Sequence, residues 1–151
     1  MLVLVHHADA VGPHVDPQRP LSTPGRAQAQ RLVDQLAAAR TAGSTLAGWA
    51  PAAIWHSGKL RARQTAEPFL ALNPFAPFKM VAGLRPDDPP EIILTALASA
   101  PADLVLVSHM PYLPALRHRL TGVSGFPLHG LVVLDRDGDG WREVLVLGGD
   151  L

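Results

Sequence analysis

Two segments in which histidine follows a short apolar run are the strongest candidates for chemistry in this sequence. His6 and His7 come directly after the apolar residues 2–5, and His109 follows residues 104–107 after a single serine. Short runs of branched apolar residues are typical of strands buried on both faces of a parallel sheet. Ligands bind such sheets outside the carboxyl ends of the strands. The histidines are therefore expected to share a site, although a His-His pair alone also fits ordinary polar residues at a strand end.

A third apolar run, residues 52–56, leads into a segment that could bind an anion. Ser57 follows this run, and Arg61 lies where the first turn of the next helix is expected. Free N–H groups and the helix dipole favour negative charge at a helix N-terminus. An arginine adds two parallel hydrogen bonds that match a phosphate. Taken alone, Arg61 and Arg63 are better explained as the solvated face of an amphipathic helix.

The remaining sequence predicts alternating helices and strands that would position these residues. Ser22 or Thr23 as N-cap, Pro24 in the first turn and apolar residues at helical spacing predict a helix to about Arg40. Further helices are predicted over residues 59–72, 91–100 and 111–120, with Pro68 shortening or kinking the first of them. Further strands are predicted over residues 78–81, 128–134 and 141–147. The last two flank DRDGDG, which indicates a hairpin turn.

This order of elements predicts an α/β fold, a single three-layer α/β/α domain over residues 1–151. Its central sheet is expected to be mostly parallel, with a C-terminal antiparallel hairpin. The strands at residues 2–5, 52–55 and 104–107 are expected to be adjacent near the sheet centre. At 151 residues the chain is long enough to bury such a core.

Composition argues against several classes of function. The chain has no cysteine, so a thiolate nucleophile or metal ligand is impossible. Its 13 basic and 13 acidic residues cancel, so nucleic acid is not an expected partner. No segment approaches the roughly 20 apolar residues that cross a bilayer, and no basic region precedes the first apolar run. We therefore expect a soluble cytoplasmic protein with no membrane partner. The spacing of the other histidines does not match a zinc hydrolase; these are His14, His56, His118 and His129.

Taken in order, these segments resemble the histidine phosphatase superfamily, the phosphoglycerate-mutase-like group. That family has an apolar strand ending in R-H-G, an S-x-x-x-R-A-x-Q-T-A segment and a later strand ending in G/S-H. This chain has V-H-H-A at residues 5–8, S-G-K-L-R-A-R-Q-T-A at 57–66 and V-S-H at 107–109. R-P-L-S-T-P-G at 19–25 matches the family's P-L-T-x-x-G helix entry. The small size and S-H-M-P at 108–111 are most similar to the bacterial phosphohistidine phosphatase branch.

The resemblance implies a phosphatase that works through a covalent phosphoenzyme. His7 matches the nucleophile, Arg61 the clamp on the phosphoryl oxygens, and His109 a hydrogen-bond donor to them. Such a mechanism depends on positioning and charge stabilisation, and it implies no metal and no cofactor. The branch implies a phosphorylated protein carrying phosphohistidine, or a small phosphate ester, as partner. The residues implied to bind phosphate are His6, Arg61, His109, Ser57 and Arg19.

The chain departs from the family at the residue before the nucleophile. There the family has arginine and this chain has His6, which would supply a positive charge only when protonated. Activity would then rise as the pH falls through the pKa of His6. Ala8 also replaces the family's glycine. A catalytically impaired phosphate-binding or regulatory module therefore stays open as an alternative, as does a small-molecule phosphomonoesterase.

Acidic residues are candidates for a supporting role. Asp9 matches an acidic position that could orient a neighbour. Larger members of the family use a glutamate to protonate the leaving oxygen, and Asp87, Asp88 and Glu91 lie in the corresponding region. Of these, Asp88 is the candidate acid, and the alternative is an ordinary acid before a helix N-terminus.

Overall fold

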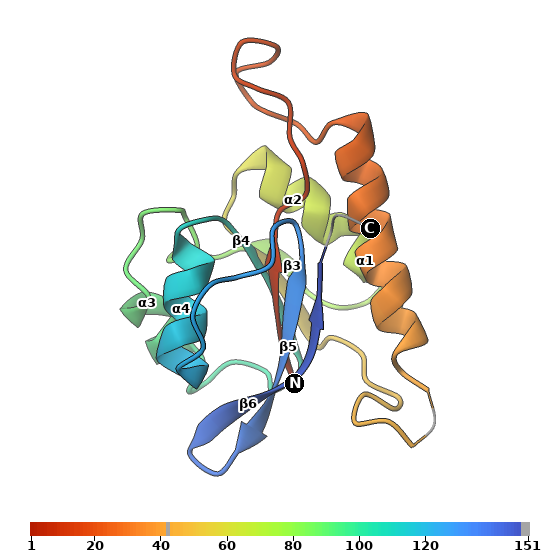
Figure 1. Cartoon of the computed structure of the whole chain (residues 1–151), viewed down its shortest axis with the longest axis vertical. Helices are drawn as coiled ribbons and strands as arrows, with labels where there is room; N and C mark the ends of the chain where they lie inside the picture. The colour runs from red at the N-terminus through yellow and green to blue at the C-terminus, as the bar shows by residue number, and fades with distance from the viewer. Residues whose placement is uncertain (42, 149–151) are drawn as a thin grey trace.

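The computed structural model describes residues 1–41 and 43–148, which are built around a six-stranded sheet in the order β3-β2-β4-β1-β5-β6 (Figure 1). Strands β1 to β4 pair in parallel, β5 is antiparallel to β1, and β6 is antiparallel to β5. The predicted α/β class, with a mostly parallel sheet and a C-terminal hairpin, is confirmed. The strands are β1 (Leu2–His6), β2 (Ala53–His56), β3 (Phe78–Met80), β4 (Leu104–Ser108), β5 (Leu131–Asp137) and β6 (Gly140–Leu147).

The three strands predicted to be adjacent, β2, β4 and β1, are neighbours near the middle of the sheet. His6 is the last residue of β1 and pairs with Ser108, the last residue of β4. Because the two strands are parallel and end together, His7 and His109 leave the sheet at the same edge. This is the edge at which ligands of such sheets bind.

Helices cover both faces of the sheet and complete three layers. One face carries Val3 and Val5 and packs against α1 (Thr23–Ala38), α2 (Leu60–Ala66) and the 3₁₀ helix η1 (Glu67–Leu72). The other carries Leu2 and Leu4 and packs against α3 (Glu91–Ala96) and α4 (Tyr112–Thr121). Alternate residues of β1 thus serve opposite layers, as a strand's period of two requires; Figure 1 shows α1 and α4 on opposite sides. Within the described ranges, no helix is long and apolar enough to cross a membrane.

The helix boundaries follow local chemistry. Ser22 is the N-cap of α1 and accepts a hydrogen bond from the Gly25 N–H at 3.0 Å, as predicted. The helix predicted over residues 59–72 stays α-helical only to Ala66 and continues as η1. Pro68 explains the change, since it lacks the N–H for an α-helical bond and its ring crowds the carbonyl of Gln64.

Two other predicted elements were longer than those in the structure. The α3 helix stops at Ala96 because its following turn tightens to three-residue hydrogen bonds, Ala98 N to the Thr95 carbonyl and Ser99 N to the Ala96 carbonyl. The β5 strand begins at Leu131 rather than residue 128.

A buried ion pair ties α4 to the outer hairpin. Arg117 donates from Nε and Nη2 to the two carboxylate oxygens of Glu143, at 2.6 and 2.8 Å. Its Nη1 donates to the Gly125 carbonyl at 3.1 Å. The two side chains are only 10% and 19% exposed. A bidentate pair this well shielded from water fixes the position of α4 against the hairpin. Removing one partner is costly in stability, because the other charge is left unpaired.

Arg117→Ala is expected to lower the free energy of unfolding by roughly 2 to 4 kcal/mol, because it leaves the Glu143 carboxylate shielded without its partner. The matched control is Arg142→Ala on the same strand, where Arg142 is 56% exposed and 3.6 Å from Asp135. That variant is expected to lose less than about 0.5 kcal/mol. Urea unfolding of both variants measures the difference, and equal losses would contradict this account of the pair.

Candidate functional site

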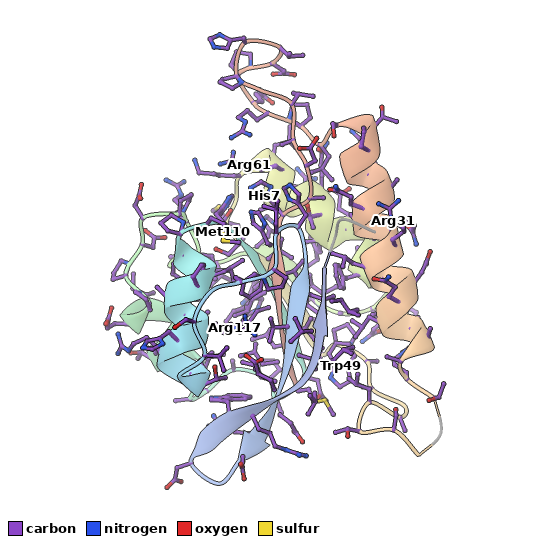
Figure 2. The ribbon with its side chains drawn as sticks, in the orientation of Figure 1. His7, Arg31, Trp49, Arg61, Met110 and Arg117 are labelled. Atoms are coloured by element: carbon purple, nitrogen blue, oxygen red, sulfur yellow. The ribbon has the colours of Figure 1, made fainter. Side chains whose placement is uncertain are left out.

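The structure brings His7, Arg61 and His109 together at the carboxyl edge of the sheet. The His7 N–H donates to the Ser108 carbonyl at 3.0 Å, so β1 and β4 remain paired up to the site. The rings of His7 and His109 have centroids 5.0 Å apart. Figure 2 shows His7 and Arg61 at the same end of the molecule, where α2 begins. The three residues matched to catalytic roles therefore share one site.

The His7 ring is held in a single tautomer. Its Nδ1 lies 2.8 Å from the carbonyl oxygen of Ala8, which can only accept, so Nδ1 carries the proton. The Nε2 atom is then left with its lone pair. Burial lowers the pKa of His7 to about 4, although the Ala8 carbonyl raises it and Arg61 lowers it further. His7 is thus a neutral imidazole with a free nucleophilic nitrogen at neutral pH.

His109 presents an unused polar atom to the site. Its Nε2 shares a hydrogen bond of 2.6 Å with the hydroxyl of Ser57, which also accepts from the Lys59 N–H at 3.3 Å. Its Nδ1 is buried and has no hydrogen-bond partner within the described structure. Burial, reinforced by His7 and Arg61, lowers the pKa of His109 to about 2. A fully buried, unpartnered ring nitrogen is costly unless a ligand uses it.

Arg61 is anchored to the nucleophile's loop through Thr65. The Thr65 hydroxyl donates to the Arg61 carbonyl at 2.7 Å and accepts from the Ala8 N–H at 2.9 Å. The Arg61 Nε is buried without a partner among the residues described. Burial, followed by the charge of Arg19, lowers the pKa of Arg61, which as a guanidinium stays charged. The site therefore holds a cation with free donors beside a neutral histidine.

Arg19 enters from the loop between β1 and α1. Its backbone is left-handed, with φ of 51°, and its Nε donates to the Val11 carbonyl at 3.0 Å. The loop is fastened to α2, where the Leu21 N–H donates to Gln64 Oε1 at 2.8 Å. The positive charge of Arg19 lowers the pKa of both His7 and Arg61, which places it near the site.

Asp9 organises the entry to α1. Its carboxylate accepts from the Ser22 hydroxyl at 2.6 Å, and its carbonyl accepts from the Ser22 N–H at 3.0 Å. A Cβ at Gly25 would lie 1.9 Å from the Asp9 carbonyl oxygen, so only glycine allows the helix to approach this closely. The neighbour oriented by Asp9 is therefore the helix cap.

The predicted acids lie on the other side of the site. Asp88 Oδ2 accepts from the Arg85 N–H at 2.9 Å. Asp88 also lines a cavity of about 320 Å³ that reaches Ser57, the hydrogen-bond partner of His109. Glu91 instead pairs with Arg119 at 2.5 Å. Asp88 thus stays near the site with one oxygen already engaged, while the Glu91 carboxylate is held by α4.

His6 is buried beside His7, with only 4% of its surface exposed. Its Nδ1 accepts a hydrogen bond from the backbone N–H of His129 at 2.8 Å. Burial lowers the pKa of His6 to about 3, and His7, His129 and Arg61 act in the same direction. His6 is therefore neutral near pH 7, contrary to the hypothesis that a protonated His6 replaces the family's arginine.

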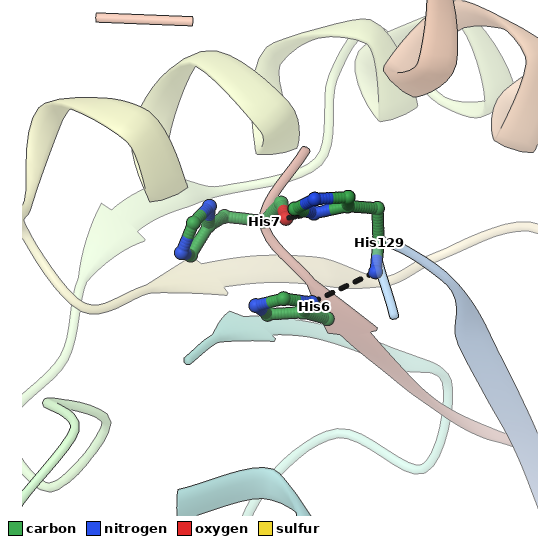
Figure 3. Close-up of side chains that lie close together, drawn as sticks. All are labelled: His6, His7 and His129. Carbon is green, nitrogen blue, oxygen red and sulfur yellow. Dashed lines mark hydrogen bonds between the residues drawn. The ribbon is translucent and has the colours of Figure 1, made fainter. Parts of the chain in front are cut away.

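His129 is a site residue that the sequence reasoning missed. Its Nδ1 lies 2.7 Å from the His7 carbonyl oxygen, and its ring stacks on His6 at 4.9 Å with an interplanar angle of 5° (Figure 3). The reason is the antiparallel register of β5 against β1, in which Val5 faces Leu131. Residues after Val5 must then face residues before Leu131. Pairing the last predicted hairpin with the first strand would have revealed it.

Solved structures match this chain over nearly its whole length, whereas no protein-family model and no curated protein sequence matches it. The protein histidine phosphatase SixA, solved with tungstate, has a TM-score of 0.80 at 21% identity and covers 98% of this chain and 96% of that chain. SixA from Agrobacterium tumefaciens, named as a phosphohistidine phosphatase, has a TM-score of 0.78 at 26% identity. The match covers 97% of this chain and 96% of that chain. A phosphoserine phosphatase from Entamoeba histolytica has a TM-score of 0.70 at 11% identity. The match covers 99% of this chain and 97% of that chain.

Fold and site together define the class: a three-layer α/β protein with a free imidazole nitrogen and a guanidinium at the carboxyl edge of its sheet. The comparisons place this class among known folds. The chain has the histidine phosphatase fold, and the solved structures it matches are phosphohistidine phosphatases and other members of that superfamily. The resemblance predicted from the motifs is therefore confirmed.

The buried neutral histidines predict that the fold loses stability in mild acid. The folded pKa values of His6, His7 and His109 lie below the ordinary value of 6.5. Below pH 6.5 the unfolded chain therefore binds protons that the folded chain excludes. The free energy of unfolding is expected to fall by up to about 1.4 kcal/mol per pH unit for each of these histidines between pH 6.5 and 5.

Urea unfolding across this pH range measures how steeply the free energy of unfolding depends on pH, in a range where carboxylates remain largely ionised. His109→Asn is expected to make the slope shallower. His118→Gln, which removes an exposed histidine, is the control and should leave the slope unchanged. A stability that does not depend on pH between 6.5 and 5 would contradict the burial of neutral imidazoles.

Proposed function

We propose that this chain is a phosphatase that transfers the phosphoryl group of its substrate to His7 and then to water, with phosphohistidine on a protein as the substrate. The observation that carries the proposal is the free Nε2 of His7 in a site where Nε of Arg61 and Nδ1 of His109 have no partner among the described residues. With the Ser57 hydroxyl donating to Nε2 of His109, the proton of that ring lies on Nδ1. Such a set of donors stabilises the charge on a phosphoryl group in transfer. The mechanism needs no metal and no cofactor.

In the first step the lone pair on His7 Nε2 attacks phosphorus, and the bond from phosphorus to the leaving atom breaks. The proton on Nδ1 remains in its hydrogen bond to Ala8, so the phosphorylated ring is a cation that the carbonyl stabilises. Arg61 and His109 hold the phosphoryl oxygens. In the second step water attacks phosphorus, the bond from phosphorus to Nε2 breaks with its electron pair returning to Nε2, and inorganic phosphate leaves as dihydrogen phosphate with both protons of the water. His7 is neutral again with its Nδ1 proton in place.

The leaving group favours phosphohistidine as substrate. An alkoxide from a phosphate ester needs a proton donor as it departs. A phosphorylated imidazole that carries a proton on its second nitrogen departs as a neutral ring and needs none. This suits a site where Asp88 is engaged with Arg85 and Glu91 with Arg119. Two of the matched structures named above are themselves called histidine or phosphohistidine phosphatases.

The covalent step predicts acid-labile phosphate on His7. After incubation with a phosphohistidine protein and an alkaline quench, mass spectrometry is expected to find the phosphoryl group on His7. His7→Ala is expected to lose at least about a thousandfold in kcat/KM, because it removes the nucleophile. Full activity in this variant would rule out the mechanism. Binding of inorganic phosphate without turnover would instead favour a phosphate-binding module.

The clamp predicts that two neighbouring arginines on α2 behave differently. Arg61→Ala is expected to lower kcat/KM by about 100- to 1000-fold, since it removes charged donors from the transferred group. Arg63→Ala is the matched control: Arg63 pairs with Glu67 on the exposed side of the helix, so its loss should change kcat/KM less than threefold. Equal losses would mean that α2 contributes only general positive charge.

A further inference from the structure

Three histidines, His6, His7 and His129, form a cluster in which one ring nitrogen of each lies within 4.8 Å of the others. Such a cluster can do one of two things. Three lone pairs could bind a metal ion, whereas a ring that directs an N–H inward could bind an anion. The hydrogen bonds around the rings decide between these possibilities.

Two of the rings carry a proton on the same nitrogen. The Nδ1 atoms of His7 and His129 lie 2.8 Å and 2.7 Å from the carbonyl oxygens of Ala8 and His7. A carbonyl oxygen can only accept, so both Nδ1 atoms are protonated. In the neutral His7 ring the Nε2 atom then carries the lone pair.

His6 has the opposite tautomer. Its Nδ1 is contacted by the backbone N–H of His129, which can only donate, so this nitrogen carries the lone pair. A neutral His6 ring must then carry its proton on Nε2. Figure 3 shows the bonded nitrogen of His6 toward His129 and the other nitrogen on the side of the His7 ring. A protonated Nε2 cannot ligate a metal, so His6 is a donor in this cluster.

The arrangement that imposes this tautomer is rigid. The His6 N–H donates to the Gly130 carbonyl at 2.9 Å, and its ring is stacked on that of His129. His129 itself has φ of 49°, a left-handed conformation that L-residues other than asparagine and aspartate rarely adopt. In this conformation the backbone N–H of His129 donates to Nδ1 of His6, and its Nδ1 donates to the His7 carbonyl.

We propose that His6 donates an uncharged hydrogen bond from Nε2–H to the phosphoryl group on His7, and that His129 is the positioning residue that fixes the required tautomer. The proposal rests on the proposed function for the identity of the bound group. The phosphoryl oxygens would lie two bonds from the nucleophilic nitrogen, within reach of a donor in this cluster. The charged and titratable groups that face His6 are His7, His109, His129 and Arg61. Burial, His7, His129 and Arg61 all disfavour a proton on Nδ1 of His6, so the donor stays uncharged through the neutral pH range.

Nitrogen-15 NMR of the ring nitrogens in the intact wild-type chain tests the tautomers without reference to activity. At pH 7, His6 is expected to show an unprotonated Nδ1 and a protonated Nε2, His7 the reverse, and His129 a protonated Nδ1. Inorganic phosphate, used as the probe, is expected to shift the Nε2–H signal of His6. A protonated Nδ1 on His6, no shift with phosphate, or loss of the His6 Nε2 proton on addition of Zn²⁺ would each overturn the proposal. This measurement stands even if the chain proves to have no phosphatase activity.

The activity of His6 variants distinguishes an uncharged hydrogen-bond donor at this position from a protonated, cationic His6. His6→Gln keeps an uncharged N–H and is expected to stay within about fivefold of wild type in kcat/KM. His6→Leu, close in volume but without a donor, is expected to lose about 10- to 100-fold. The ratio of wild type to His6→Gln should stay constant from pH 8 to 6. A ratio that rises as the pH falls would show that His6 acts as a cation, and wild-type activity in His6→Leu would show that it donates nothing.

Two variants of His129 test its positioning role. His129→Gly keeps the backbone N–H but removes the stacked ring and the bond to His7, which are the contacts that hold this N–H against Nδ1 of His6. Mixed tautomers of His6 and a fall in kcat are therefore expected. His129→Asn tolerates the left-handed backbone and offers a side-chain N–H for the His7 carbonyl. It is expected to restore the single tautomer and most of the activity. An unchanged His6 tautomer in His129→Gly would exclude His129 as the positioning residue.

Discussion

The pairing of β1 with β4 on one side and β5 on the other is the constraint on which the site depends. Parallel pairing with β4 ends both strands at one edge and brings His109 to His7. Antiparallel pairing with β5 brings the residues before Leu131 to the residues after Val5. A slip of either register by one residue would turn every side chain of the slipped strand to the opposite layer. The buried faces of β1 against two helical layers therefore protect the geometry of the site as well as the core.

Around this edge, backbone groups set the protonation of each imidazole. The Ala8 and His7 carbonyls place protons on the Nδ1 atoms of His7 and His129, and the His129 N–H excludes one from Nδ1 of His6. Burial then keeps the His6 and His7 rings uncharged, since Arg61 already supplies positive charge nearby and a second buried cation would be repelled. The site has a fixed guanidinium charge and directional, uncharged donors and acceptors.

His6 stands where the resembled family has arginine, and its ring is positioned by His129. A histidine is shorter than an arginine and has two ring nitrogens, so one can be tied to the backbone while the other serves the site. The stacked partner limits rotation of the ring. A chain that has lost one charge from this position has gained a rigid orientation for an uncharged donor.

The sequence by itself determined the fold class, the central strands and the grouping of His7, Arg61 and His109. These follow from hydrophobic runs, helix signals and motif residues that are local in the chain, because the ends of parallel strands share one edge. Tertiary structure alone decided the tautomers, the uncharged state of His6 and the presence of His129 in the site. Those properties depend on burial and on hydrogen bonds between residues more than a hundred positions apart, such as His6 and His129. Local pattern carries no information about such contacts until the register of β5 against β1 is known.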